Sequence, residues 1–255
     1  MFHIPLRPGA DPPPPPSSSP APGGFPGLAE GQLHEVHADA DGWASALAFG
    51  LAAIEAGAGR PILLLRVRKR ARTLRMEPCG EGWAPLGLDP ARLVIVDAAD
   101  DAALLRAALD AVRCPGSAGV VMETWGRMRE YDLVASRRLI LAAEQSRIPV
   151  VILRGDAEPR PSAAHTRWSV ASAPSTPLEM RAPGAPALHV ELQRRRGGPG
   201  GLRWRLEWNE EHGGFHAEPI ESAIPGPLEA ESPPLPGAVV SLAAVRTREP
   251  QRRSA

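Results

Sequence analysis

Residues His37 to Ala44 lie in register with a phosphate-binding loop but lack the groups that bind phosphate. Such a loop requires G-x-x-x-x-G-K-[ST], because backbone N–H groups surround the phosphates, the lysine reaches the terminal ones and the hydroxyl holds Mg²⁺. Gly42 is in register, but Trp43 stands at the lysine position and Ala44 at the hydroxyl position. The only lysine of the chain is Lys69, so no other segment supplies the motif. We therefore predict that the chain has no nucleotide cofactor.

Two groups of acidic residues stand where an ATPase or another α/β protein could use them. Glu123 follows an apolar run, at the position where a phosphate-loop ATPase carries a carboxylate for Mg²⁺ or for the attacking water. Phosphoryl transfer needs the complete set of positioned groups, so this carboxylate alone does not predict hydrolysis. Asp97, Asp100 and Asp101 follow another predicted strand, where α/β ligand sites form, but helix capping explains at least one of them.

Two arginine-rich segments are candidates for contact with DNA or with a partner protein. They could neutralise phosphates of single-stranded DNA, although no aromatic residue is interleaved to stack on bases. A solvated charged face is the alternative, and direct DNA contact stays open. The first segment follows an apolar run and should emerge at the ligand-binding edge of the sheet, and the second adjoins a Gly-rich turn. The candidate residues are Arg66, Arg68, Lys69, Arg70 and Arg72, beside Arg75, in the first segment, and Arg194, Arg195 and Arg196 in the second.

No other catalytic or metal-binding pattern is present in the sequence. Cys79 and Cys114 are far apart and lack metal-ligand spacing, and neither lies at ligand spacing from any of the seven scattered histidines. The chain also lacks the G-x-S-x-G motif of serine hydrolases. We predict no metal ion, no catalytic residues and no enzymatic activity.

Composition predicts one central domain between two proline-rich tails. Most of the 30 prolines lie near the two ends of the 255-residue chain, and such segments bury too little apolar surface to fold. We predict disordered tails at 1–27 and 217–255 and one domain at 28–216. The formal net charge of zero argues against a generally basic surface for nucleic acid. No apolar stretch has the length of a signal peptide or a membrane helix, so we expect a cytoplasmic protein.

Short apolar islands interrupt the proline-rich tails. Phe25 and Leu28 form one island, and Val239, Val240 and Leu242 belong to another. Such islands are typical of docking peptides that become ordered on a partner, although random occurrence in a disordered chain is the alternative.

The order of the expected elements predicts an α/β fold. Strand-like runs alternate with helical patterns up to residue 154, which is typical of parallel strands joined by crossover helices. Asp41 is expected to cap the first helix, and Asp100 or Asp101 the second. The expected strands are 32–36, 62–67, 93–96, 119–122 and 149–153, with helices at about 41–54, 100–112 and 132–147.

After residue 154 the pattern changes to antiparallel strands at 166–170, 189–193 and 202–208, the last two joined by a Gly-rich turn at 197–201. In the last strand Trp204, Leu206 and Trp208 share one face, while Arg203 and Arg205 share the other. This alternation predicts a sheet with one buried and one wet face. The fold class we expect is a three-layer α/β core with a mainly parallel central sheet, C-terminal antiparallel strands and disordered tails.

With these elements in place, the chain resembles a divergent RecA-like protein, and more closely the inducible mutagenesis protein A (ImuA) family. The resemblance covers roughly 28–215 and leaves both tails unmatched. It rests on the order and spacing of several segments, which are Leu33–Val36, Gly87–Leu93, Asp132–Glu144, Ser162–Trp168 and His189–Trp208.

The resemblance implies a RecA-like fold without a phosphate loop and a non-catalytic accessory role in SOS-inducible translesion DNA synthesis and damage-induced mutagenesis. It implies two partners, an inactive Y-family-like polymerase subunit and an error-prone C-family DNA polymerase, with RecA as an additional candidate. It also implies a cytoplasmic protein that associates with the nucleoid when DNA is damaged.

Two alternative functions remain from the residues. The first is an ATP-dependent protein in which the run from Arg66 to Arg72 replaces the missing lysine. The second is a recombination modulator that joins or blocks RecA filaments, for which the N-terminal island around Phe25 is the candidate contact.

Overall fold

A computed structural model of the chain describes residues 24–54, 59–69, 77–83, 86, 89–114, 116–211 and 213–220. The described part forms one nine-stranded sheet of order β3-β2-β4-β5-β1-β6-β7-β8-β9. The strands are β1 (Leu33–Ala38), β2 (Ile62–Val67), β3 (Leu93–Ala98), β4 (Gly119–Trp125), β5 (Val150–Gly155), β6 (Thr166–Ala173), β7 (Ala187–Arg195), β8 (Leu202–Asn209) and β9 (Gly214–Pro219). The main helices are α1 (Trp43–Ala52), α4 (Asp101–Val112) and α5 (Leu133–Ser146). Shorter helical turns are α3 (Gly80–Trp83), η3 (Pro90–Arg92) and η4 (Glu179–Arg181).

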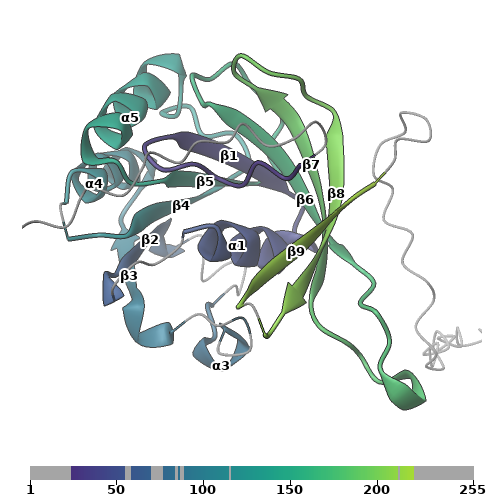
Figure 1. Ribbon diagram of the computed structural model, residues 1–255. Coiled ribbons are helices and arrows are strands. Elements are labelled where there is room, and N and C mark those ends of the chain that lie inside the picture. Colours follow the sequence, from purple (N-terminus) through teal and green to yellow (C-terminus); the bar gives the residue numbers. More distant parts are fainter. Residues whose placement is uncertain are drawn as a thin grey trace, which may run out of the picture. The chain divides into compact units, whose positions relative to one another are not determined.

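The central parallel strands β4 and β5 are buried on both faces, as their continuous apolar sequences require, whereas the edge strand β3 is partly exposed. All six residues of β5 are buried, and so are all seven of β4. One face packs against α1, and the other packs against α4 and α5 (Figure 1). The predicted three-layer α/β class, with a mainly parallel sheet and C-terminal antiparallel strands, is confirmed.

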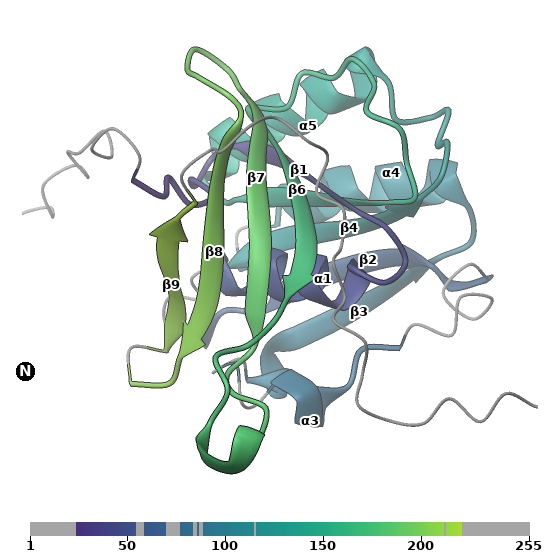
Figure 2. The same ribbon diagram turned by 90° about the vertical axis from the view of Figure 1, so that its right-hand side faces the viewer.

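The antiparallel strands complete the core around α1. Apolar residues of β6, β7 and β8 belong to the same buried cluster as α1, and both views show these strands beside that helix (Figures 1 and 2). The alternation predicted for β8 is present, since Trp204, Leu206 and Trp208 are buried and the residues between them are not. The buried apolar face that β6, β7 and β8 pack against α1 therefore follows from the alternation of apolar and polar residues along these strands.

Two features of the sheet differ from the sequence prediction. β6 was expected to begin the antiparallel part, but it pairs in parallel with β1 and antiparallel with β7. The parallel part therefore has six strands. The second difference is β9, which was not predicted and which extends to Pro219, past the expected domain boundary at 216.

One of the two expected helix caps is present, and α5 has a further cap that was not predicted. The Asp100 carboxylate accepts a hydrogen bond from Ala103 N at 2.7 Å, which confirms one of the two predicted caps of α4. Asp132 caps α5 in the same way through Ala135 N. The expected cap of α1 by Asp41 is absent, because no side chain caps that helix.

The tails predicted to be disordered fall largely outside the described residues, and so do Val239, Val240 and Leu242. None of the helices in the described part is long and apolar enough to cross a membrane.

Candidate functional site

The turn between β1 and α1 uses one of its own carboxylates as a hydrogen-bond acceptor. Asp39 Oδ1 accepts a hydrogen bond from Gly42 N at 2.6 Å. This bond is possible because a side chain three residues earlier reaches back across a short turn. In a working phosphate loop the backbone N–H groups face the ligand. Here the amide of Gly42 is already bonded to an anion of the chain itself.

Two tryptophans and a glutamate fill the space beside this turn. The rings of Trp43 and Trp125 lie with their centroids 4.8 Å apart. Trp125 Nε1 donates a hydrogen bond to Glu123 Oε1 at 2.8 Å, and all three side chains are buried. The lysine position thus holds an indole, and the acidic residue opposite it accepts a hydrogen bond from a second indole.

Gly155, at the end of β5, makes room for Trp125. A methyl group added to Gly155 would overlap the six-membered ring of that indole. The absence of a side chain at this position is therefore what allows Trp125 to lie over the sheet end and reach Trp43.

Sequence reasoning missed Trp125, since the expected strand ended at residue 122. A period-two signal was available, because Glu123 and Trp125 are two residues apart and share a face when β4 continues. Glu123 is inside the strand and not beyond its end, which differs from the expected position of the ATPase carboxylate.

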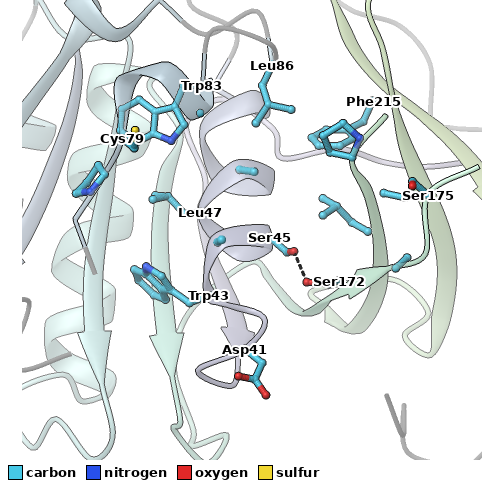
Figure 3. A pocket seen from close by; sticks show the side chains of 18 of the residues that line it. Asp41, Trp43, Ser45, Leu47, Cys79, Trp83, Leu86, Ser172, Ser175 and Phe215 are labelled. Atoms are coloured by element: carbon cyan, nitrogen blue, oxygen red, sulfur yellow. Dashed lines mark hydrogen bonds between the residues drawn. The ribbon is translucent and has the colours of Figure 1, made fainter. Parts of the chain in front are cut away.

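A cavity of about 690 Å³ lies beside α1, and we call it the α1 pocket. It opens between α1, the segment around α3, the loop that leads into β7 and the edge strand β9 (Figure 3). Ser45 Oγ and Ser172 Oγ, which are 2.8 Å apart, link α1 to β6 on one side of it. Apolar lining residues include Trp43, Leu47, Trp83, Leu86, Leu188 and Phe215.

The charges of the α1 pocket are acidic. Asp41, Glu77 and Glu123 line it, and the described lining residues include no lysine, arginine or histidine. A polyanion such as ATP needs cations or free amides for its phosphates. The pocket therefore favours apolar or positively charged groups over a nucleotide.

A second polar cluster is buried on the opposite face of the sheet, around Glu35 of β1. Tyr131 OH and Arg167 Nε each donate a hydrogen bond to this carboxylate at 2.8 Å, and His37 Nε2 lies 3.9 Å from it. The guanidinium of Arg154 lies over the Tyr131 ring, 5.3 Å from its centroid. The cluster joins β1, β5, β6 and the loop before α5.

The electrostatics of this cluster favour a charged carboxylate. Burial alone would raise the pKa of Glu35, but the neighbouring polar side chains of His37, Ser162 and Arg167 outweigh burial and lower that pKa to about 2. Burial raises the pKa of Tyr131 above its ordinary value, so this group remains a hydrogen-bond donor. Glu35 is only 2% exposed, so the arrangement suits an anchor for the surrounding loops better than a catalytic group.

The first arginine-rich segment divides into a buried and an exposed part. Arg66 is buried, which differs from its expected place at an open edge, and it pairs with Glu77 at 2.7 Å and Asp97 at 3.1 Å. These hydrogen bonds outweigh the effect of burial and raise the pKa of Arg66. Arg68 is exposed and lies 3.5 Å from Asp97, and Lys69 is also exposed. Arg70, Arg72 and Arg75 lie outside the described residues.

The second arginine-rich segment is at the turn between β7 and β8. Arg194 points back into the chain, where its Nη2 donates to Ala164 O at 2.7 Å and to Ser162 O at 3.4 Å. Arg195 and Arg196 are exposed.

The described parts of the two arginine-rich segments lie apart. Arg66 is near the carboxyl end of β2, which is parallel to β4. Arg195 pairs with Thr166 at the start of β6, and Thr166 pairs with His34 near the start of β1. Arg66 and Arg195 are therefore at opposite ends of the parallel strands.

The N-terminal island packs into the core of its own chain. The Phe25 ring lies 5.7 Å from Trp168, 5.5 Å from Trp204 and 6.2 Å from Phe49, measured between centroids. Leu28 is buried in the same cluster. In this conformation neither side chain is presented to a partner.

His34 is buried and contributes to packing. His34 Nδ1 lies 2.7 Å from Thr166 Oγ1, and burial lowers the pKa of His34 to about 4. Among the described residues, no three histidine, cysteine or acidic side chains are grouped to hold a metal ion.

Comparison with curated proteins identifies relatives that are named ImuA. No model of a known protein family matches the chain. Protein ImuA of Caulobacter vibrioides strain NA1000 / CB15N is 39% identical over 147 residues, which are 53% of this chain and 58% of that protein. The ImuA protein of strain ATCC 19089 / CIP 103742 / CB 15 gives the same values. The chain therefore matches less than two thirds of the length of these curated relatives.

Among solved structures, the crystal structure of the RadB recombinase is similar with a TM-score of 0.47 and 17% identity. The similarity covers 71% of this chain and 88% of that one.

The packing of Trp125 over Gly155 generates a first prediction. We expect Gly155→Ala to lower the free energy of unfolding by about 1–3 kcal/mol, because the new methyl group displaces the indole. Urea denaturation and the near-ultraviolet circular dichroism of the tryptophans measure this effect. Gly116→Ala is the matched control, since a methyl group there meets nothing within 4 Å. Equal stability of the two variants would contradict the proposed contact.

The lowered pKa of Glu35 generates a second prediction. A folded-state pKa of about 2 against an ordinary value of 4.5 means that this carboxylate stabilises the fold fully above about pH 4.5 and loses that effect as the pH falls towards 2. The contribution is about 3 kcal/mol at neutral pH, of which about 2 kcal/mol is lost at pH 3. Glu35→Gln should therefore be less stable at pH 7 and lose less stability on acidification.

Urea denaturation at pH 7 and pH 3 measures this difference. The control is Glu191→Gln, which removes the partially exposed pair with Arg203 on the sheet surface and should change stability by less than about 1 kcal/mol. A Glu35→Gln variant with the acid sensitivity of the wild type would show that Glu35 does not carry the effect.

Proposed function

We propose that this chain is a non-catalytic accessory protein of damage-induced mutagenesis, because it is 39% identical over 147 residues to the ImuA proteins of Caulobacter vibrioides. In this role it binds components of a translesion polymerase assembly and performs no phosphoryl transfer. The proposed partners are an inactive Y-family-like polymerase subunit and an error-prone C-family polymerase, with RecA as a further candidate. The proposed setting is the cytoplasm, with recruitment to the nucleoid under SOS control.

The observation that carries this proposal is the contact between Trp43 and Trp125 at the register of the missing phosphate loop. Two buried indoles, a bonded glutamate and an acidic pocket replace the lysine, the hydroxyl and the open amides that a nucleotide needs. A domain with this core keeps surfaces for binding other macromolecules but lacks the groups for phosphoryl transfer.

The ATP-dependent alternative receives little support from the first arginine-rich segment. Its buried member, Arg66, is held by Glu77 and Asp97, so moving it to a phosphate would break two ion pairs. The recombination alternative relied on Phe25, which packs against Trp168 and Trp204 of its own chain.

Nucleotide binding separates the binding protein from the ATP-dependent alternative. We expect no saturable binding of a fluorescent ATP analogue with Mg²⁺ at concentrations up to about 1 mM, which corresponds to less than about 4 kcal/mol of binding free energy. Saturable binding that is lost in an Arg68→Ala, Arg70→Ala, Arg72→Ala triple variant would support the alternative and overturn this proposal.

Complex formation tests the assembly itself. We expect the purified chain to co-elute in size-exclusion chromatography with at least one of the two polymerase proteins from the same genome, at both moderate and high salt. Persistence at high salt distinguishes apolar contact from screened attraction between charged surfaces. Failure to form a complex with either polymerase protein or with RecA, while the chain is folded, would refute the accessory role.

A further inference from the structure

The loop between β6 and β7, residues 174–186, carries the most exposed large apolar side chain of the described residues. Met180 is 99% exposed, and Leu178 is 62% exposed two residues before it. Both views show the loop extending away from the sheet, with η4 at its far end (Figures 1 and 2). Two apolar side chains are thus placed where the fold of the chain does not cover them.

The backbone at the tip has an unfavourable conformation. Met180 has φ 58° and ψ 25°, in the left-handed region that side chains other than glycine rarely adopt. The cost is about 1–2 kcal/mol. Strain of this kind is maintained only when the surroundings determine the conformation, and it is concentrated at binding sites.

Hydrogen bonds attach the first arm of the loop, residues 174–176, to β8. Thr176 donates from its backbone N and from Oγ1 to the Glu207 carboxylate, at 3.0 and 2.8 Å. Arg205 Nη2 donates to Pro174 O at 2.9 Å, and its Nη1 lies 2.6 Å from Glu207 Oε2. The base of the loop is therefore attached to the surface of β8.

The arms also contact each other closely. Gly184 N donates to Ser175 Oγ at 3.1 Å, and Leu178 N donates to Ala182 O at 2.9 Å. A methyl group on Gly184 would collide with Thr176 O, so only glycine permits this approach. Prolines at 174, 177, 183 and 186 further restrict the backbone. The apolar tip is consequently held in place before any partner binds.

The charges of the loop indicate the kind of partner. Glu179 and Arg181 are the only charged residues in 174–186, so the loop has no net charge. DNA and anionic membranes attract clusters of Lys and Arg, which this loop lacks. A protein cleft lined by apolar side chains fits better, and methionine adapts its shape to such clefts.

We propose that residues 174–186 form a preformed docking finger that inserts Leu178 and Met180 into an apolar cleft of a polymerase protein in the assembly described above. The inference rests on the proposed function and names the surface that serves it. A prearranged loop loses little conformational entropy on binding, which explains why the chain maintains a strained tip.

The test compares one substitution at two places of equal exposure. Leu178→Asp alters the docking finger, and Leu141→Asp alters an equally exposed leucine on α5, since the two side chains are 62% and 63% exposed. Calorimetry measures the affinity of each purified full-length variant for the polymerase protein that the wild type binds. We expect Leu178→Asp and Met180→Asp each to weaken binding at least about 10-fold, while Leu141→Asp retains the wild-type affinity.

A fourth variant separates loss of the side chain from loss of the fold. Met180→Gly removes the apolar group, and glycine adopts positive φ without strain. We expect its Tm to equal or exceed that of the wild type while its affinity falls about 10-fold. Retained affinity in this variant would overturn the inference.

The remaining outcomes are distinguishable. Wild-type affinity in all finger variants would refute the docking finger and leave the accessory role intact. No binding by the wild type would refute the accessory role and this inference with it. Loss of single-stranded DNA binding or of self-association in the finger variants, with polymerase binding unchanged, would assign the finger to DNA or to a second copy and overturn the protein cleft.

Discussion

The contact between the indoles of Trp43 and Trp125 is the constraint on which the region around the β1–α1 turn depends. It requires a glycine at position 155, a strand that continues two residues beyond Glu123, and a helix that starts at Trp43 without a capping side chain. Together these place two large apolar groups where an ATPase would keep water, metal and phosphate. This region is therefore part of the core, and apolar burial contributes to its stability.

The other face of the sheet is organised by charge. The Glu35 carboxylate accepts hydrogen bonds from Tyr131, in the loop before α5, and from Arg167 of β6. A buried carboxylate without such partners would strongly destabilise the fold. This arrangement fixes the crossover from β5 to β6, in which Arg167 Nη2 also donates to the carbonyl of Arg160. The parallel and antiparallel halves of the sheet are thus joined by an ionic network on one face and by the aromatic cluster around Trp168 on the other.

The distribution of surface groups is consistent with a protein that binds others. Among the described residues, the exposed Arg68 and Arg195 are at opposite ends of the parallel strands, and the most exposed large apolar side chains are on the loop between β6 and β7 and on α5. Separate small surfaces suit a protein that contacts several partners, each through a few side chains.

Local patterns in the sequence determined most of the fold and part of the site. Apolar runs such as Val150–Leu153 and the alternation in Leu202–Trp208 predict their strands, because burial on one or both faces imposes the period. The absence of a phosphate loop is equally local, since Trp43 and Ala44 stand at the positions of the lysine and the hydroxyl residue that bind phosphate and Mg²⁺. Only the tertiary structure decided that Trp125 packs against Trp43. The same holds for the burial of Arg66 beside the carboxylates of Glu77 and Asp97, and for the full exposure of Met180. Each of these depends on which distant segments meet, and a contact between side chains far apart in the chain leaves no period in the sequence to read.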